Sequence, residues 1–175
     1  MTPVRIDIVP VGRIAAAVVE YLQLVLPETL NLPCRLRHAT IDIRRAYDDR
    51  RRQYRSREIL TQLADLDEAD EVKILGVTDV DLFIPVLTFV FGEAQLGGRA
   101  AVVSVHRLRQ EFYGLPPDEK LFLERCEKEA LHELGHTFGL VHCRRLGCVM
   151  HFSNSIAEVD LKSSTFCPSC ARRLP

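Results

Sequence analysis

The cysteines and histidines of this 175-residue chain are concentrated near its C-terminal end. There are six of each, and those beyond residue 131 are His132, His136, His142, Cys143, Cys148, His151, Cys167 and Cys170. An even number of cysteines is typical of disulfide frameworks, but mainly in short secreted chains. Thiols interleaved with imidazoles over so short a stretch instead favour metal binding. The C-terminal segment is therefore expected to fold around metal.

The remaining sequence is typical of one globular domain. A length of 175 residues suffices for a single core, and 47% hydrophobic with 27% charged residues excludes a disordered chain. A formal charge of −1 excludes a general polyanion binder. Residues 1–13 lack the pattern of a signal peptide, and no segment approaches the roughly 18 apolar residues of a membrane helix. We expect a cytoplasmic, monomeric protein with reduced thiols and no membrane association.

Hydrophobic periodicity in the first half of the chain predicts alternating strands and helices. The expected strands are residues 5–9, 36–43 and Val72–Thr78; the expected helices run from Ile14 to before Pro27, and from a cap at Ser56 to the acidic stretch 65–71. This β-α-β-α-β order predicts parallel strands with right-handed crossovers.

The second half is expected to complete the sheet and then add one long helix. The expected elements are a loop at residues 79–85, strands at 88–91 and 100–105 separated by a glycine-rich segment at 92–98, and a helix at 120–138 capped by Asp118. The short connection between the last two strands predicts an antiparallel edge strand. Beyond Gly139 the sequence shows little periodicity.

Residues 132–136 read His-Glu-Leu-Gly-His inside this expected helix. A spacing of four residues is slightly more than one turn, so the imidazoles of His132 and His136 project from one face and can bind one zinc ion. Gly139 permits a backbone turn that ends the helix and returns the chain to His142 as a third ligand. Ordinary helix-surface histidines are the alternative, but they give no reason for the placement of Glu133, Gly139 and His142.

Three histidines leave one position of a tetrahedral zinc site open for water. Zinc lowers the pKa of that water to about 7 and polarises a carbonyl, and Glu133 can take the proton and pass it to the leaving amine. The implied reaction is hydrolysis of a peptide bond by Glu-assisted attack of zinc-bound water. Because the histidines must be neutral to bind zinc, activity is expected to fall in acid.

The four cysteines Cys143, Cys148, Cys167 and Cys170 have the spacing C-x4-C and C-x2-C, which is close to that of a structural zinc site. A closed set of four thiolates leaves no open position for a reaction. Disulfides between the two pairs are the alternative. A metal here would clamp the loop that presents His142.

A segment rich in arginine, residues 44–57, has tyrosines interleaved. One interpretation is a nucleic-acid patch. The other is a solvated surface loop followed by a helix start, partly neutralised by Asp48 and Asp49. The second is favoured because no nucleic-acid-binding motif accompanies the arginines.

The chain resembles the archaemetzincins, a branch of the metzincins with additional cysteines. The likeness rests on residues 132–143 (HELGHTFGLVHC), 148–150 (CVM) and 167–170 (CPSC). It extends through residues 81–94 (DLFIPVLTFVFGEA) and 111–119 (EFYGLPPDE), and so covers nearly the whole chain.

The resemblance implies an α/β (α+β) fold of the metzincin-like zincin type. Its parts would be a twisted mixed five-stranded sheet with an antiparallel edge strand, backing helices, an active-site helix and a small Cys-rich C-terminal subdomain. Residues 1–175 would form one catalytic domain, with a sheet and helix subdomain at 1–139 and a zinc-bound subdomain at 140–175. The edge strand at 88–95 would pair with a peptide or protein substrate bound as an extended strand.

For the site, the resemblance implies two zinc ions per chain. One would be catalytic, on His132, His136 and His142 with Glu133 as base, and the other structural, on the four cysteines. Met150 would form the Met-turn, an apolar floor under the catalytic metal.

One feature departs from the metzincin pattern. Many metzincins place a tyrosine just after this methionine to assist the transition state, whereas here His151 and Phe152 follow and no tyrosine occurs after Tyr113. This leaves the stabilising group open, with His151 as one alternative.

These observations predict a zinc-dependent metallopeptidase. The alternative is a latent or non-catalytic zinc-stapled binding module, which could bind nucleic acid through residues 44–57 together with Arg172 and Arg173.

Overall fold

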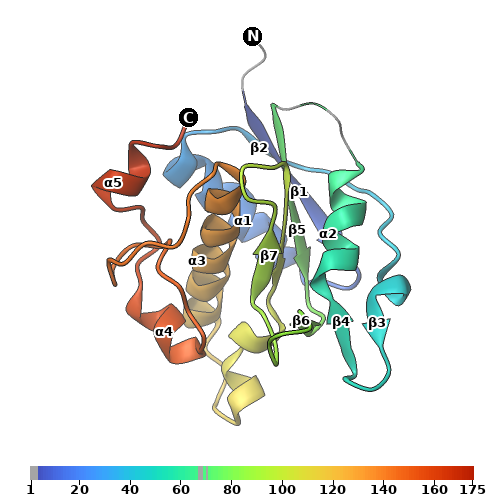
Figure 1. Cartoon of the computed structure of the whole chain (residues 1–175). Helices are drawn as coiled ribbons and strands as arrows, with labels where there is room; N and C mark the ends of the chain where they lie inside the picture. Colours follow the sequence, from blue (N-terminus) through green and yellow to red (C-terminus); the bar gives the residue numbers. More distant parts are fainter. Residues whose placement is uncertain (1–3, 67–68, 70) are drawn as a thin grey trace.

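A computed structural model describes residues 4–66, 69 and 71–175. Its centre is a five-stranded sheet in the order β2-β1-β5-β8-β7 (Figure 1). The strands are β1 (Arg5–Val11), β2 (Cys34–Leu36), β5 (Val72–Thr78), β7 (Gly92–Ala94) and β8 (Ala100–Ser104). The first four in sheet order run parallel, and β7 is an antiparallel edge strand on β8. The expected mixed sheet with an antiparallel edge is confirmed.

Side chains of the central strands alternate between two cores. Ile6 and Ile8 of β1 belong to the core beneath α1 (Ala16–Leu30) and α3 (Glu119–Thr137), whereas Val9 belongs to the core beneath α2 (Ser56–Ala64). Figure 1 shows α1 and α3 to the left of the sheet and α2 to its right. The sheet is therefore buried on both faces, as parallel sheets require.

Helix α3 begins and ends as its sequence predicts. The carboxylate of Asp118 accepts a hydrogen bond from the backbone N–H of Leu121 (3.0 Å), which satisfies a free donor of the first turn. After the helix, Gly139 adopts φ +84°, a left-handed conformation that disfavours other residues.

A small second sheet lies beside the main one. It contains β3 (Tyr47–Asp48), β4 (Gln53–Arg55) and β6 (Leu82–Phe83), so the segment 79–85 is not wholly a loop as predicted. The prediction of an edge strand at 88–91 was also wrong, because Val90 bridges to Leu82 of β6 and the strand that pairs with β8 is β7, preceded by a single hydrogen bond from Ser104 to Phe91.

Three other predicted boundaries differ from the structure. Helix α1 continues through Pro27, because its last turn is stabilised by Leu30, which packs in the core and is 3% exposed. The second strand, β2, lies at Cys34–Leu36 instead of 36–43. Ser56 is not the cap of α2, because its hydroxyl lies 3.2 Å from the carbonyl oxygen of Phe83 and 2.5 Å from the carboxylate of Glu93.

The C-terminal segment contains two short helices that were not predicted, α4 (Ile156–Leu161) and α5 (Pro168–Ala171). The start of α4 carries a capping box formed by Ser155 and Glu158, a signal that the sequence does contain. Arg125 of α3 binds Asp160 of α4 through two hydrogen bonds of 2.7 Å, which holds α4 against α3.

Part of the expected acidic stretch 65–71 and the first three residues of the N-terminal segment 1–13 lie outside the described residues. Among the helices that are described, none is long and apolar enough to cross a membrane. Within the described ranges, the remaining elements are 3-10 turns at Ile43–Ala46, His106–Leu108 and Gln110–Tyr113.

Candidate active site

The structure brings the three predicted histidine ligands together. His132 and His136 lie one turn apart on α3, and His142 reaches the same point from the loop that follows Gly139. One ring nitrogen from each lies within 4.8 Å of the others. The turn at Gly139 thus brings His142 back to the two histidines of α3.

The orientation of these imidazoles suits a metal. Nδ1 of His132 lies 2.9 Å from the carbonyl oxygen of Val149, and Nδ1 of His136 lies 2.7 Å from that of Leu140. Carbonyl oxygens only accept hydrogen bonds, so each Nδ1 is the protonated nitrogen and each Nε2 carries a lone pair. The two Nε2 atoms are 3.2 Å apart, close to the roughly 3.3 Å expected for two nitrogens on a tetrahedral zinc. Two lone pairs facing each other at this distance repel unless a cation lies between them.

The pKa values of all three histidines are lowered. Burial is the main cause in each case, and the positive charge of Lys162 adds to it. The three imidazoles are therefore neutral near pH 7, which is the form that binds zinc.

Glu133 lies beside this cluster and is 6% exposed. Burial raises its pKa well above the ordinary value, and the negative charges of Glu129 and Glu93 raise it further, against the opposing charge of Lys162. A carboxylate with a raised pKa is a stronger base, as a proton acceptor in catalysis requires.

Gly92 is a residue that sequence reasoning missed. A Cβ at this position of β7 would lie 2.6 Å from Cγ of Glu133 and 2.6 Å from the carbonyl oxygen of Val102. The absence of a side chain therefore lets the edge strand pass directly over the candidate base. The available signal was a glycine within an expected strand region, which often marks close approach of another group.

Met150 is fully buried and packs against Gly135 of α3. A Cβ at Gly135 would collide with its sulfur and lie 3.1 Å from its Cε. The glycine inside the His-Glu-Leu-Gly-His motif thus makes room for the predicted methionine floor.

A buried ion pair beside the cluster was also missed. Nζ of Lys162 lies 2.7 Å from the carboxylate of Glu129, and their side chains are 0% and 4% exposed. Glu129 stands one turn before Glu133 on α3, and Lys162 follows α4 in the C-terminal segment. The pair joins the two parts of the chain that supply the site. Its sequence signal is weak, since isolated charged residues usually lie at the surface.

The four predicted cysteine ligands also converge. Their sulfurs lie within 4.8 Å of one another, and all of the cysteines are free thiols. Sγ of Cys143 and Sγ of Cys167 are 3.9 Å apart, which exceeds the roughly 2.05 Å of a disulfide and is near the roughly 3.8 Å between two sulfurs on one zinc. A hydrogen bond from the backbone of Cys170 lowers the pKa of Cys167 to about 6.

The two clusters share one loop. The backbone N–H of Cys143 donates to the carbonyl oxygen of Met150 (2.9 Å), and Cys143 directly follows His142. The carbonyl oxygen of Val149, next to Cys148, holds Nδ1 of His132. A metal on the cysteines would therefore fix groups that orient two of the histidines.

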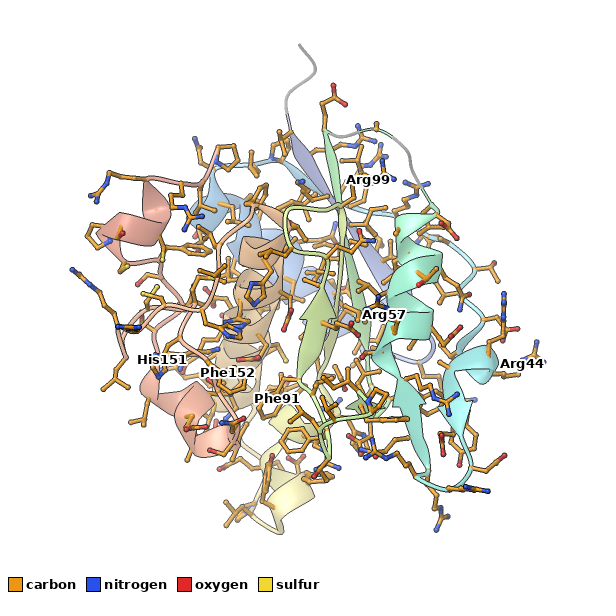
Figure 2. All side chains as sticks on the ribbon, in the orientation of Figure 1. Arg44, Arg57, Phe91, Arg99, His151 and Phe152 are labelled. Atoms are coloured by element: carbon orange, nitrogen blue, oxygen red, sulfur yellow. The ribbon has the colours of Figure 1, made fainter. Side chains whose placement is uncertain are left out.

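The histidine cluster opens into a cleft of about 580 Å³. Its walls include Thr88, Val90, Phe91, Gly92 and Ala94 from the edge-strand side, Glu129, His132, Glu133 and His136 from α3, and Val141, His142, Phe152, Ser153 and Asn154 from the C-terminal segment. Phe91, just before β7, and Phe152, in the C-terminal segment, thus both reach the cleft (Figure 2). The cleft combines an apolar lining with a few convergent polar groups, which is typical of a substrate site.

His151 and Phe152 have different surroundings. Nδ1 of His151 bonds to the carbonyl oxygen of Cys143 (2.9 Å), and His151 is not among the residues that line the cleft. The ring of Phe152 lies 4.8 Å from that of His142 and does line the cleft. This arrangement does not favour His151 as the group that replaces a tyrosine.

The arginine-rich segment 44–57 and the arginines near the C-terminus do not form one surface. Figure 1 shows β3 and β4 at the right edge of the molecule and α5 at the left edge. Asp48 binds Arg55 (2.6 Å) and Asp42 binds Arg44 (3.1 Å), so part of the charge is neutralised. A nucleic-acid module spanning both regions is not favoured.

Comparisons with known proteins agree with this geometry. The model of Peptidase family M54 matches residues 8–175. An archaemetzincin from Pyrococcus furiosus is 51% identical over 130 residues, covering 74% of this chain and 68% of the relative. The crystal structure of archaemetzincin from Methanopyrus kandleri has a TM-score of 0.85 and 42% identity, covering 98% and 93% of the two chains. That of a zinc-dependent peptidase from Methanocorpusculum labreanum has a TM-score of 0.86 and 29% identity, covering 97% and 100%. The chain therefore belongs to peptidase family M54, the family of the archaemetzincins.

Proposed function

We propose that this protein is a zinc metallopeptidase that hydrolyses peptide bonds in the cleft described above, with His132, His136 and His142 as ligands of the catalytic zinc and Glu133 as the base. Membership of the peptidase family supports the activity. The observation that carries the residue assignment is the pair of Nε2 lone pairs converging 3.2 Å apart beside a buried carboxylate.

Zinc bound here would acidify a water molecule and polarise the scissile carbonyl. Glu133 takes a proton from the attacking water as its oxygen bonds to the carbonyl carbon. Glu133 then delivers that proton to the nitrogen as the C–N bond breaks, giving a carboxylic acid and an amine. The raised pKa of Glu133 suits both halves of this transfer. Val149 and Leu140 hold the two helix histidines in one tautomer throughout.

The free edge of β7 provides a place for the substrate backbone. The backbone groups of Phe91 and Gln95 face β8, since Ser104 N–H donates to Phe91 (2.7 Å) and Gln95 N–H donates to Ala100 (3.0 Å). Backbone groups alternate in direction along an antiparallel strand, so those of Gly92 and Ala94 point to the open side, where both residues line the cleft. An extended peptide can pair with them as an added strand.

The second cluster supports a structural zinc on Cys143, Cys148, Cys167 and Cys170, giving two zinc ions per chain. We propose that residues 140–175 form a zinc-bound subdomain on a sheet and helix subdomain at 1–139, both within one catalytic domain. Since the four cysteines are not bridged, we extend the proposal to a reducing, cytoplasmic compartment, where thiols persist without forming disulfides. We also propose that the protein is a monomer.

Metal removal tests this function. Treatment with 1,10-phenanthroline is expected to reduce cleavage of a quenched fluorescent peptide library to background, because the histidines alone cannot polarise the carbonyl. Addition of zinc after removal of the chelator should restore cleavage, whereas addition of magnesium should not, since imidazoles select zinc. Cleavage that persists when zinc analysis shows the loss of metal would contradict the proposal.

A further inference from the structure

The arginine-rich segment has contacts that the peptidase mechanism does not use. The turn between β3 and β4 is fixed by Asp48, whose carboxylate accepts hydrogen bonds from the backbone N–H groups of Arg50 and Arg51 (both 3.1 Å). Its carbonyl oxygen also accepts one from Arg52 (2.7 Å), which adopts φ +56°. The backbone of this turn is therefore well defined, and it directs the side chain of Arg51 toward the segment before the edge strand.

Arg51 holds that segment by three contacts. Its guanidinium donates to the carbonyl oxygens of Ile84 (3.3 Å) and Leu87 (3.1 Å), and it lies over the ring of Phe83 at 4.2 Å. Just after this turn, at the start of β4, the side-chain amide of Gln53 donates to the carbonyl oxygen of Thr88 (3.0 Å). Three backbone carbonyls of one short segment are thus bound by side chains of this turn and of the strand that follows it.

The segment 84–88, here named the cleft lip, borders the candidate active site. Ile84, Leu87 and Thr88 line the cleft. Val86 at its tip is 83% exposed, and Leu87 is 40% exposed. Exposed apolar side chains at the rim of a binding groove are typical of contacts with a ligand. The lip has a backbone hydrogen bond of its own, from Leu87 N–H to the carbonyl oxygen of Ile84 (3.1 Å), but its exposed residues pack little, so the bonds from Arg51 and Gln53 contribute much of what holds it in place.

We propose that the cleft lip is a substrate-binding element for apolar side chains and that Arg51 is its positioning residue. The inference rests on the proposed function, in which an extended peptide pairs with Gly92 and Ala94. The lip lies just before β7 in the chain. An extended peptide that pairs with Gly92 and Ala94 therefore reaches the lip where it continues beyond the Gly92 end of β7. Val86 and Leu87 then cover apolar side chains of the peptide at that point.

Peptide affinity tests the lip separately from catalysis. In a Glu133→Gln background, the probes are two fluorescein-labelled decapeptides, one with leucine at alternate positions and one with serine at those positions. Adding Arg51→Ala is expected to weaken binding of the leucine peptide about 5- to 10-fold, since the loss of two charged hydrogen bonds frees the lip. Binding of the serine peptide should change less than about twofold. Val86→Ser should likewise weaken binding of the leucine peptide more than that of the serine peptide, and it leaves the hydrogen bonds of Arg51 and Gln53 unchanged.

Arg50→Ala is the matched control. Arg50 is exposed and adjacent to Arg51, but within the described part of the chain it contributes its backbone N–H to the turn. It should bind both peptides as the parent does. The affinity of Arg51→Lys for the leucine peptide should lie between those of the parent and of Arg51→Ala, because an ammonium group can reach one carbonyl but cannot reproduce the planar guanidinium.

In the protein with Glu133 intact, Arg51→Ala should raise KM for the leucine peptide and leave kcat within about twofold, since uniform binding is lost. Equal affinity of Arg51→Ala and the parent for the leucine peptide, at unchanged zinc content, would overturn the inference and leave the peptidase intact. Equal weakening for both peptides would also overturn it, because the lip would then have no apolar preference. Failure of the peptidase assignment itself would show as cleavage that survives Glu133→Gln.

Discussion

Replacing Glu133 with glutamine is expected to lower kcat/KM for peptide hydrolysis by about 10²- to 10⁴-fold, the usual contribution of a general base. Glutamine keeps the size of the side chain but cannot accept the proton of the attacking water. The effect should fall on kcat, because Glu133 acts while the bond is being broken. Steady-state kinetics on a quenched fluorescent peptide measure it.

Two controls make this result specific. Zinc content should be unchanged, since Glu133 is not among the converging ligand nitrogens. Glu124→Gln makes the same chemical change on the same helix, at a residue whose side chain is 44% exposed, and should retain full activity. If Glu133→Gln cleaves peptides at the parent rate, then another group is the base and the assignment fails.

Replacing Cys148 with serine is expected to have the largest effect on stability. Structural zinc sites contribute roughly 10–16 kcal/mol of apparent binding free energy in isolated zinc-finger peptides. Loss of one thiolate should remove much of this binding free energy, and we expect Tm to fall by more than about 10 °C. Metal analysis should show that the structural zinc is lost.

The same substitution should also weaken the catalytic zinc, although Cys148 is not its ligand. The neighbouring carbonyl of Val149 holds Nδ1 of His132, and Cys143 follows His142. Once the cysteines are no longer clamped, both histidines lose their fixed orientation. Cys34→Ser is the control, because Cys34 lies on β2, outside the cysteine cluster, and should change neither zinc. A Cys148→Ser variant with a full-strength catalytic zinc would refute this coupling.

Elements with strong local patterns could be predicted from the sequence. Strand β5 matches its expected bounds because an apolar run bounded by polar residues marks a strand buried on both faces. Helix α3 begins at its predicted cap, Asp118, because that side chain satisfies a free backbone donor. The histidine and cysteine clusters were predictable because ligand spacing reflects metal geometry directly.

Features that depend on distant contacts could not be predicted. The edge strand lies at β7 because the preceding residues pair with β6, a partner that local periodicity does not reveal. The ion pair of Lys162 and Glu129 joins residues 33 positions apart, and nothing in either local sequence marks them as partners. The role of Gly135 becomes visible only when Met150 is seen to occupy the space of its missing side chain.

The function of the arginine-rich segment was likewise hidden. The composition of this segment favoured the interpretation as a solvated surface loop, and most of its side chains are indeed exposed. The contacts of Arg51 with the cleft lip depend on the turn that Asp48 fixes and on the position of β6, neither of which composition indicates.

Zinc stoichiometry combined with thiol titration tests the central claim most directly. The native protein should contain two zinc ions per chain. After denaturation in the presence of a chelator but without reductant, all six cysteines should titrate as free thiols. One zinc ion together with only two titratable thiols would mean that the cysteine cluster forms two disulfides, and it would contradict the account of a catalytic site held in place by a second, structural zinc.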